Sequence, residues 1–266
     1  MSGDEQVVLI ASAGVAVWAW YGWYIPAIIV ERLGAPRPGR RFIFLTPVVC
    51  AAVLFLVLKT VSAHDVRDDP RYLGFYLLVG AGWLGAATKW LPFAGLSARD
   101  DVVERGNGAA ALALAGALVA VTICFAGGNI GDGPGWWVVV FAAALATGTL
   151  AILWLLLDRL TGLSDTVTID RDTAAGIRLT GLLVGGGLIL GRAVAGDWVS
   201  IEATVHDFAR AGWPVLVLFA AAALVERWAR PTPERPLPSI ITLGVLPAVV
   251  YVAAAAAYVA RLRPVW

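Results

Sequence analysis

Two arginines and two glycines recur on one side of the apolar segment at about residues 173–196. Arg178, Gly181, Gly185 and Arg192 follow one another at steps of three, four and seven residues. At about 100° per residue, these steps place the four positions within roughly 60° of one another on a helix. Glycines admit a neighbouring backbone, and arginines bind anionic groups, so the stripe predicts contact with an anionic solute or a lipid head group.

The same two arginines also fit a simpler arrangement. Arg178 lies near one end of the apolar segment and Arg192 lies near the other. A long side chain at a segment end can extend its charged group to the membrane interface while its aliphatic part stays in lipid. The stripe is therefore a candidate solute pathway or lipid contact, and interfacial anchoring is the alternative.

Two carboxylates at the ends of other apolar segments are further candidates. Asp158 and Glu226 each precede an arginine, Arg159 and Arg227. An acid beside a base at matched ends of two helices could form a polar ring around a pore or an interface. The alternative is that these charges only fix the depth of each helix in the bilayer.

The histidines lie in loops, together with several carboxylates. The residues concerned are His64, Asp65, Asp68, Asp69, Asp197, Glu202, His206 and Asp207. If the loops meet, these groups could bind a divalent cation, and solvated loop charge is the alternative. The chain has no phosphate-binding loop, no zinc-protease motif and no nucleophile elbow, and its histidines lie outside the apolar segments. We therefore expect no enzyme activity, no cofactor and no metal.

An aromatic cluster occupies the middle of the first apolar segment. Its members are Trp18, Trp20, Tyr21, Trp23 and Tyr24. Aromatic residues of membrane helices usually gather at the interfaces. A cluster at this depth could contact a pigment, a quinone, a lipid or another subunit, and packing within the protein or against lipid is the alternative.

The segments that carry these residues are long enough to cross a membrane. Hydrophobic residues make up 59% of the chain and charged residues only 15%, whereas a soluble domain carries about a quarter charged residues. About 20 apolar residues cross a bilayer as a helix, because a helix satisfies its own backbone hydrogen bonds. We place eight spans at about 6–30, 42–64, 72–92, 108–127, 136–157, 173–196, 207–229 and 239–261. The sequence therefore predicts an all-α polytopic membrane protein.

Positive charge is divided unevenly between the loops. The loops after even-numbered spans hold only Arg67 and Arg71. The loops after odd-numbered spans hold Arg32, Arg37, Arg40, Arg41, Arg99, Arg105, Arg159, Arg171, Arg227, Arg230 and Arg235, and the C-terminal tail adds Arg263. Because basic loops stay in the cytoplasm, both termini are predicted to lie outside.

One short pattern occurs twice. Residues 107–116 and 172–181 share the pattern N/D-x-A-A-x-L/I-x-L-x-G, and each copy starts a span. Asn107 and Asp172 can cap a helix through a side-chain oxygen, and the small residues suit close helix contact in lipid. Spans 4–5 and 6–7 are therefore predicted to be parallel copies of one helical hairpin, with chance similarity between small-residue helices as the alternative.

This prediction divides a single membrane domain into three parts. Residues 1–95 form an N-terminal three-helix segment, residues 96–229 form the duplicated hairpins, and residues 230–266 hold the last helix.

Four short motifs between about residues 97 and 198 are shared with a known family. They are Glu104-Arg-Gly-Asn107-Gly-Ala-Ala-Ala, Leu157-Asp158-Arg159-Leu160, Asp172-Thr-Ala-Ala-Gly and Gly196-Asp197-Trp198. In these motifs the region resembles the YjfL-type bacterial inner-membrane proteins, a family of unknown function, although Thr173 stands where asparagine is more usual. The resemblance implies a multi-pass protein of a bacterial or archaeal cytoplasmic membrane, and it implies no activity.

Two classes of function fit these features. In the first, the protein is a passive channel or a transporter of a small solute or ion, and the stripe on residues 173–196 lines or gates the path. In the second, it is a non-catalytic membrane subunit or anchor that docks partner helices. Its expected partners are the lipid bilayer and either further copies of the chain or a membrane subunit. A net charge of +1 gives no nucleic-acid surface.

Overall fold

The computed structural model describes residues 1–32, 39–232 and 239–262, and over these residues the chain is helical with no sheet. The long helices are α1 (Gly3–Arg32), α2 (Arg40–Thr60), α4 (Pro70–Trp90), α5 (Gly108–Gly127), α6 (Trp136–Thr161), α8 (Thr173–Ala193), α9 (Ile201–Gly212), α10 (Pro214–Ala229) and α11 (Leu246–Arg261). The short elements are α3 (His64–Asp68), the 3-10 helix η1 (Leu91–Ala94), the π-helix η2 (Ala98–Glu104), α7 (Leu163–Thr168) and the π-helix η3 (Ile241–Val245).

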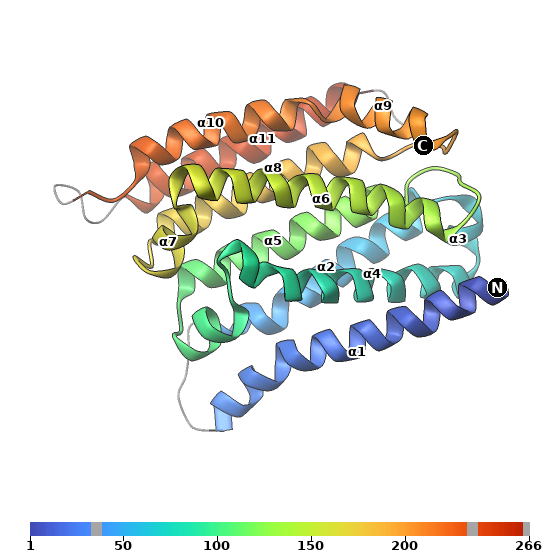
Figure 1. Cartoon of the computed structure of the whole chain (residues 1–266), viewed down its shortest axis with the longest axis horizontal. Coiled ribbons are helices and arrows are strands. Elements are labelled where there is room, and N and C mark those ends of the chain that lie inside the picture. Colours follow the sequence, from blue (N-terminus) through green and yellow to red (C-terminus); the bar gives the residue numbers. More distant parts are fainter. Residues whose placement is uncertain (33–38, 233–238, 263–266) are drawn as a thin grey trace.

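The long helices run lengthwise through one bundle, and both described chain ends lie at the same end of it (Figure 1). Six described helical segments are long and apolar enough to cross a membrane, and the bent pair α9–α10 makes a seventh. The sequence predicts eight spans. The remaining helix, α4, has the length of a span, but its glycines and tyrosines and Lys89 lower its mean hydropathy. The basic residues Arg37, Arg235 and Arg263 of the orientation argument lie outside the described residues.

The predicted span at 207–229 is not one straight helix. It is part of a longer pair, α9 and α10, whose axes differ by 41°. The bend falls at Trp213 and Pro214, because proline lacks an N–H and its ring clashes with the preceding turn. Another proline, Pro247, follows the π-helical turn η3 at the start of α11.

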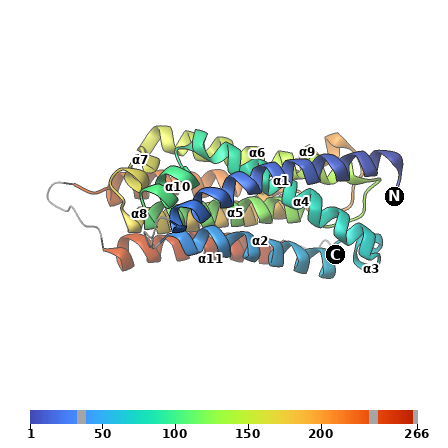
Figure 2. The same ribbon diagram turned by 90° about the horizontal axis from the view of Figure 1, so that it is seen from below.

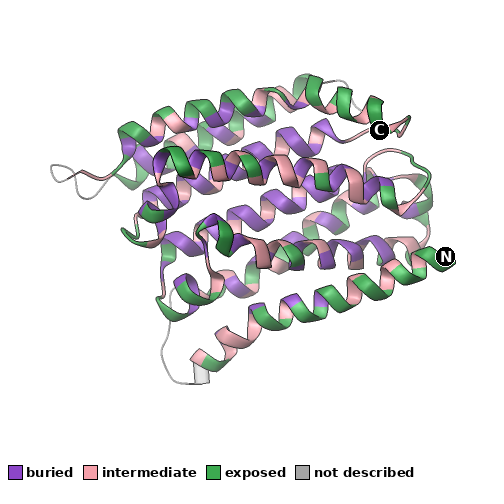
Figure 3. Ribbon diagram, in the orientation of Figure 1, coloured by how far each residue is buried: buried purple, intermediate pink, exposed green. Residues whose placement is uncertain are grey.

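Helices α5 and α8 form the centre of the bundle. In each, 78% of the most apolar window is buried, against 17% in α1, and Figure 3 shows the same contrast between the inner and outer helices. α2 packs on α5 and α11 packs on α8. Both flanking helices lie on one side of the central pair, and α6 lies on the other side (Figure 2).

The two central helices touch backbone to backbone. A Cβ atom added to Gly127 would lie 2.1 Å from the carbonyl oxygen of Gly191, and one added to Gly176 would lie 2.6 Å from that of Ala109. The starts of the two helices lie together, and so do their ends, so α5 and α8 are parallel. In lipid, small residues stabilise such a pair because the two backbones can approach closely and make many van der Waals contacts.

The turns that lead into α5 and α8 have the same backbone geometry. The cap residue Asn107 donates its N–H to the carbonyl of Asp101 at 2.9 Å, and Asp172 donates to that of Thr166 at 3.1 Å. The residue before each cap has a positive φ, 64° at Gly106 and 55° at Arg171. The two copies of the sequence pattern therefore begin with equivalent turns.

The opposite ends of α5 and α8 also correspond. Gly131 and Gly196 follow the two helices, and their φ angles are 103° and 141°. The turns pair with each other: Gly196 donates its N–H to the carbonyl of Ile130 at 2.9 Å, and Asp132 donates to Asp197 Oδ1 at 2.8 Å. The aspartates at these equivalent positions are 65 residues apart in the chain.

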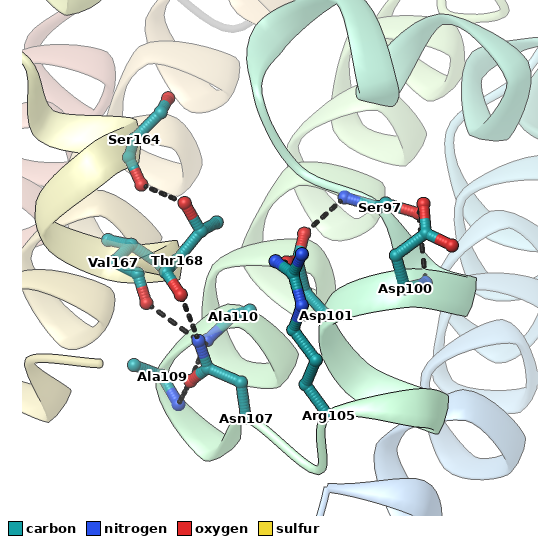
Figure 4. Close-up of polar contacts among 10 residues, drawn as sticks. All are labelled: Ser97, Asp100, Asp101, Arg105, Asn107, Ala109, Ala110, Ser164, Val167 and Thr168. Carbon is teal, nitrogen blue, oxygen red and sulfur yellow. Dashed lines mark hydrogen bonds and ion pairs between the residues drawn. The ribbon is translucent and has the colours of Figure 1, made fainter. Parts of the chain in front are cut away.

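Asn107 also joins the two inner turns. Its Oδ1 accepts from the N–H groups of Ala109 and Ala110, which caps α5, and its Nδ2 donates to the Val167 carbonyl at 2.8 Å and to that of Thr168 at 3.3 Å (Figure 4). The side chain is only 2% exposed. One amide thus completes its own helix cap and fastens that cap to α7.

Replacement of Gly127 by alanine tests the central contact. We expect Gly127→Ala to lower the free energy of unfolding by roughly 1–3 kcal/mol, because a new methyl group must displace a backbone. Denaturation in mixed detergent micelles measures this. Gly148→Ala is the control, since its Cβ would meet no atom within 4 Å. Equal stability of the two variants would contradict the close packing.

Asn107→Asp tests the link between the inner turns. The variant keeps an oxygen for the α5 cap but replaces the donor to Val167, so we expect a loss of about 1–3 kcal/mol in unfolding free energy. Asp100→Asn is the matched control in the adjacent π-helix η2, and its exposed side chain predicts a change within about 0.5 kcal/mol. An Asn107→Asp protein as stable as this control would refute the role of Nδ2.

Candidate functional site

A buried ion pair joins α8 to α10. Arg178 Nε donates to Glu226 Oε1 at 2.7 Å, and Arg178 Nη2 donates to Oε2, also at 2.7 Å. Arg178 is 0% exposed and Glu226 is 5% exposed. The two parallel hydrogen bonds match the fork of the guanidinium to the carboxylate, which is the strongest geometry for such a pair. Two sequence-predicted site residues, 48 positions apart, are thus brought together.

A third segment completes this site. Arg178 Nη1 donates to the backbone carbonyl of Leu243, which lies in the π-helix η3. π-Helical turns depart from the regular hydrogen-bond ladder and are frequent at functional sites. One guanidinium therefore ties together α8, α10 and the start of the last helical segment.

Arg178 is fully buried inside the bundle, close to the start of α8. It lies five residues after the first residue of α8, which is roughly 8 Å along the helix axis. Its guanidinium is enclosed by protein. Removing water from two charges is costly, and the bidentate pair and the third hydrogen bond offset that cost.

The predicted stripe forms the seam between α8 and α11. A Cβ atom on Gly181 would lie 2.5 Å from Ala248 Cα, and one on Gly185 would lie 2.9 Å from the Tyr251 carbonyl oxygen. Arg192, at the far end, is partly buried and lies within electrostatic reach of a tyrosine of α11. α11 therefore covers the stripe in this conformation.

An open groove lies between α10 and α11, beside the ion pair. Its volume is about 760 Å³, and its lining includes Val225, Leu243 and Tyr251. Tyr251 is 4% exposed, and its hydroxyl group is buried with no hydrogen-bond partner among the described residues. The same tyrosine interacts electrostatically with Glu226 and Arg178. The groove thus brings a mostly apolar surface to the edge of a charged site.

Asp158 has a different environment from Glu226. Its Oδ1 accepts the N–H of Ser164 at 2.6 Å, which joins the end of α6 to α7. Arg159, the next residue, is exposed. Asp158 and Glu226, which the sequence places at matched helix ends, therefore have different partners. Of these two acids, only Glu226 pairs with Arg178.

His64 and His206, which the sequence places in loops, lie instead in the helices α3 and α9. His64 Nδ1 lies 2.6 Å from Asp68, and His206 Nδ1 lies 3.6 Å from Asp207. Among the described residues no group of three His, Cys, Asp or Glu side chains is placed to hold a metal ion. The loops do meet, however, because Asp65 lines the same cavity as segments around residue 196.

The aromatic cluster of α1 packs mainly against neighbouring helices. Trp20 Nε1 donates to the Ala81 carbonyl of α4 at 3.0 Å, and Trp23 Nε1 donates to a backbone carbonyl of α2 at 2.9 Å. Trp18 and Tyr21 face outward, with 62% and 66% of their surface exposed. The cluster therefore joins helices on one side and presents two rings on the other.

Two parts of the ion-pair site are not evident from sequence patterns. Leu243 contributes a backbone carbonyl, which any residue type would supply. Tyr251 lies in an apolar span where aromatic residues are common. The sequence feature that points to this part of the site is Pro247, which follows the irregular turn η3.

Comparison with protein-family models, curated proteins and solved structures finds no match to this chain. The resemblance to the YjfL-type family therefore stays a prediction. The class of the protein follows from its own helices: it is a multi-pass integral membrane protein, since at least six described helices suit a lipid bilayer.

Glu226→Ala tests the energetic role of the ion pair. We expect a loss of roughly 3–5 kcal/mol in unfolding free energy, because Arg178 stays buried without its counter-charge. The double variant Arg178→Met, Glu226→Leu should recover most of this loss, since apolar residues of similar volume need no pairing.

Micelle denaturation of both variants provides the measurement. Glu104→Ala is the matched control, because its pair with Arg99 is exposed at 2.9 Å and contributes about 0.5 kcal/mol or less. If Glu226→Ala is no less stable than Glu104→Ala, the pair does not hold α8 to α10.

Proposed function

We propose that the chain forms a passage for a small solute or ion across a membrane, as a channel or a transporter. The observation that carries the proposal is the buried Arg178–Glu226 pair beside the α10–α11 groove. Ionisable groups inside membrane-spanning helices are costly, and they commonly mark solute and ion pathways. Arg178 favours an anion, because an anion can replace the carboxylate as partner of the guanidinium.

The passage in this proposal follows the seam between α8 and α11. Gly181 and Gly185 present no side chains there, so α11 can shift along α8 without disengaging interlocked groups. The ion pair closes the seam, because it fastens α8 to α10 and, through Leu243, to η3. Arg192 provides positive charge at the opposite end. The seam opens when the solute replaces Glu226 as the partner of Arg178.

The proposal includes a topology. α4 serves as an eighth span, because it lies within the bundle and packs on α1 and α5. With eight crossings both termini lie outside, as the loop arginines favour. The equivalent turns at both ends of α5 and α8 support duplication of one helical hairpin. The membrane is the cytoplasmic membrane of a bacterium or archaeon, as the family resemblance implies.

One observation favours a second function, that of a non-catalytic subunit or anchor. α1 is the least buried of the candidate spans, and Trp18 and Tyr21 present exposed rings on it. Exposed aromatic groups on a helix suit a partner helix as well as lipid. Native mass after gentle extraction separates the two functions, since a stoichiometric foreign subunit favours the anchor and a homo-oligomer favours the passage.

Anion flux tests the first proposal. Proteoliposomes holding the full chain should release chloride, nitrate, acetate or phosphate faster than protein-free vesicles. In the double variant Arg178→Gln, Glu226→Gln, hydrogen bonding is kept and both charges are removed. We expect its flux to fall about tenfold or more, equivalent to at least ~1.4 kcal/mol of lost interaction with the anion.

The matched control is Arg99→Gln with Glu104→Gln, an exposed pair outside the seam. Its flux should equal that of the unmodified chain. Flux that never exceeds the protein-free vesicles, or that survives unchanged in the Arg178–Glu226 variant, would refute the passage as described.

A further inference from the structure

A cavity of about 350 Å³ lies between α4 and α6, with residues of α5 and α8 in its wall. Three tryptophans line it, Trp83, Trp90 and Trp154, together with small and aliphatic residues. Ligand pockets of proteins commonly have volumes of about 300–1,000 Å³ and walls that are mainly apolar and aromatic. The cavity therefore has the size and the wall of a site for a small molecule.

This cavity lies deep within the membrane-spanning part of the bundle. Thr147, which lines it, is the twelfth of the 26 residues of α6, so it lies roughly 16 Å from one end of that span and farther from the other. The wall residues on α5 and α8 are buried, whereas Ala86 and Ala144 are exposed at the rim. Exposed surface at this depth faces hydrocarbon, so a ligand enters the cavity from the bilayer.

Two tryptophans of α4 bridge the cavity to α6. Trp83 Nε1 donates to Thr147 Oγ1 at 3.3 Å, and the rings of Trp90 and Trp154 meet edge to face with 5.8 Å between their centroids. Space remains on α6 beside these contacts, because a Cβ atom added to Gly148 would meet no atom within 4 Å. Ring pairs are favourable beyond the area that they bury, so a wall of indoles favours a flat aromatic ligand over a flexible chain.

The hydroxyl group of Thr147 adds a hydrogen-bond donor to this wall. Other threonines in these spans donate to the carbonyl four residues earlier, as Thr122 does in α5 and Thr161 does in α6. Thr147 Oγ1 instead accepts from Trp83, and among the described residues it donates to no acceptor. Thr147 is partly exposed, and both it and Trp83 line the cavity. Because no water is present at this depth, a carbonyl oxygen of the ligand is the acceptor that this hydroxyl lacks.

We propose that this cavity binds a planar, lipid-soluble aromatic molecule whose carbonyl oxygen accepts a hydrogen bond from Thr147. The ring system lies among the three indoles, and Gly148 leaves the space for it. An acyl chain of a lipid has, at this depth, neither a ring for the indoles nor an acceptor for the hydroxyl. The inference does not depend on the proposed anion passage, because neither Arg178 nor Glu226 lines this cavity.

Equilibrium binding of 9-fluorenone to the full chain in nanodiscs tests the proposal, with protein-free nanodiscs as the blank for partition into lipid. We expect one saturable site per chain. Fluorene, the same ring system without the carbonyl, should bind about three- to tenfold more weakly, the effect of one hydrogen bond. Trp83→Phe should keep this preference, because Thr147 still donates. The double variant Trp83→Phe, Thr147→Val removes both donors and should bind the two probes equally.

Gly148→Leu tests the location of the site, because its side chain fills the cavity without meeting the backbone. We expect fluorenone binding to fall at least tenfold. Gly14→Leu is the matched control on α1, where an added Cβ also meets no atom within 4 Å and lies outside the cavity wall. The proposal is overturned if the unmodified chain binds no more fluorenone than the blank, if fluorene binds as tightly, or if the two leucine variants bind alike. Displacement of fluorenone by dodecane at equal concentration would also overturn it, since the site would then accept any acyl chain.

Discussion

Direct backbone contact between α5 and α8 is the constraint on which the rest of the structure depends. A membrane offers little hydrophobic driving force between helices, so the central pair relies on dispersion contacts and on small residues that permit them. Gly127 and Gly191 meet at one end, and Gly176 meets Ala109 at the other. The pair is parallel, and both helices are capped in the same way. It therefore presents defined surfaces on which α2, α11 and α6 pack.

The buried Arg178 guanidinium follows from this arrangement. α8 is central, so a charged residue more than one turn inside it cannot reach water and must find partners within the protein. Glu226 of α10 and the Leu243 carbonyl of η3 supply them. The site therefore joins α8, α10 and η3 through one buried guanidinium.

The ion-pair site and the cavity lined by Asp65 and Asn129 differ in charge and in position. The ion-pair site holds a guanidinium among apolar helices, whereas the cavity around Asn129 collects carboxylates and aromatic rings at the end of the bundle where α1 begins. The hydroxyl oxygen of Tyr251 and Oδ1 of Asn129 are each buried with no hydrogen-bond partner among the described residues. Such groups are rare in folded proteins, because a buried polar atom without a partner loses the hydrogen bonds it makes with water.

The sequence by itself determined the membrane class, the position of most spans and the caps at Asn107 and Asp172, because hydropathy, length and capping act locally along the chain. It also pointed to Arg178 and Glu226, since charge within an apolar segment is visible without a structure. Only the tertiary structure decided that these two residues pair, that α11 covers the glycine stripe, and that Glu5, Asp65 and Asn129 share a cavity. Those relations depend on which helices become neighbours, and no local pattern specifies that.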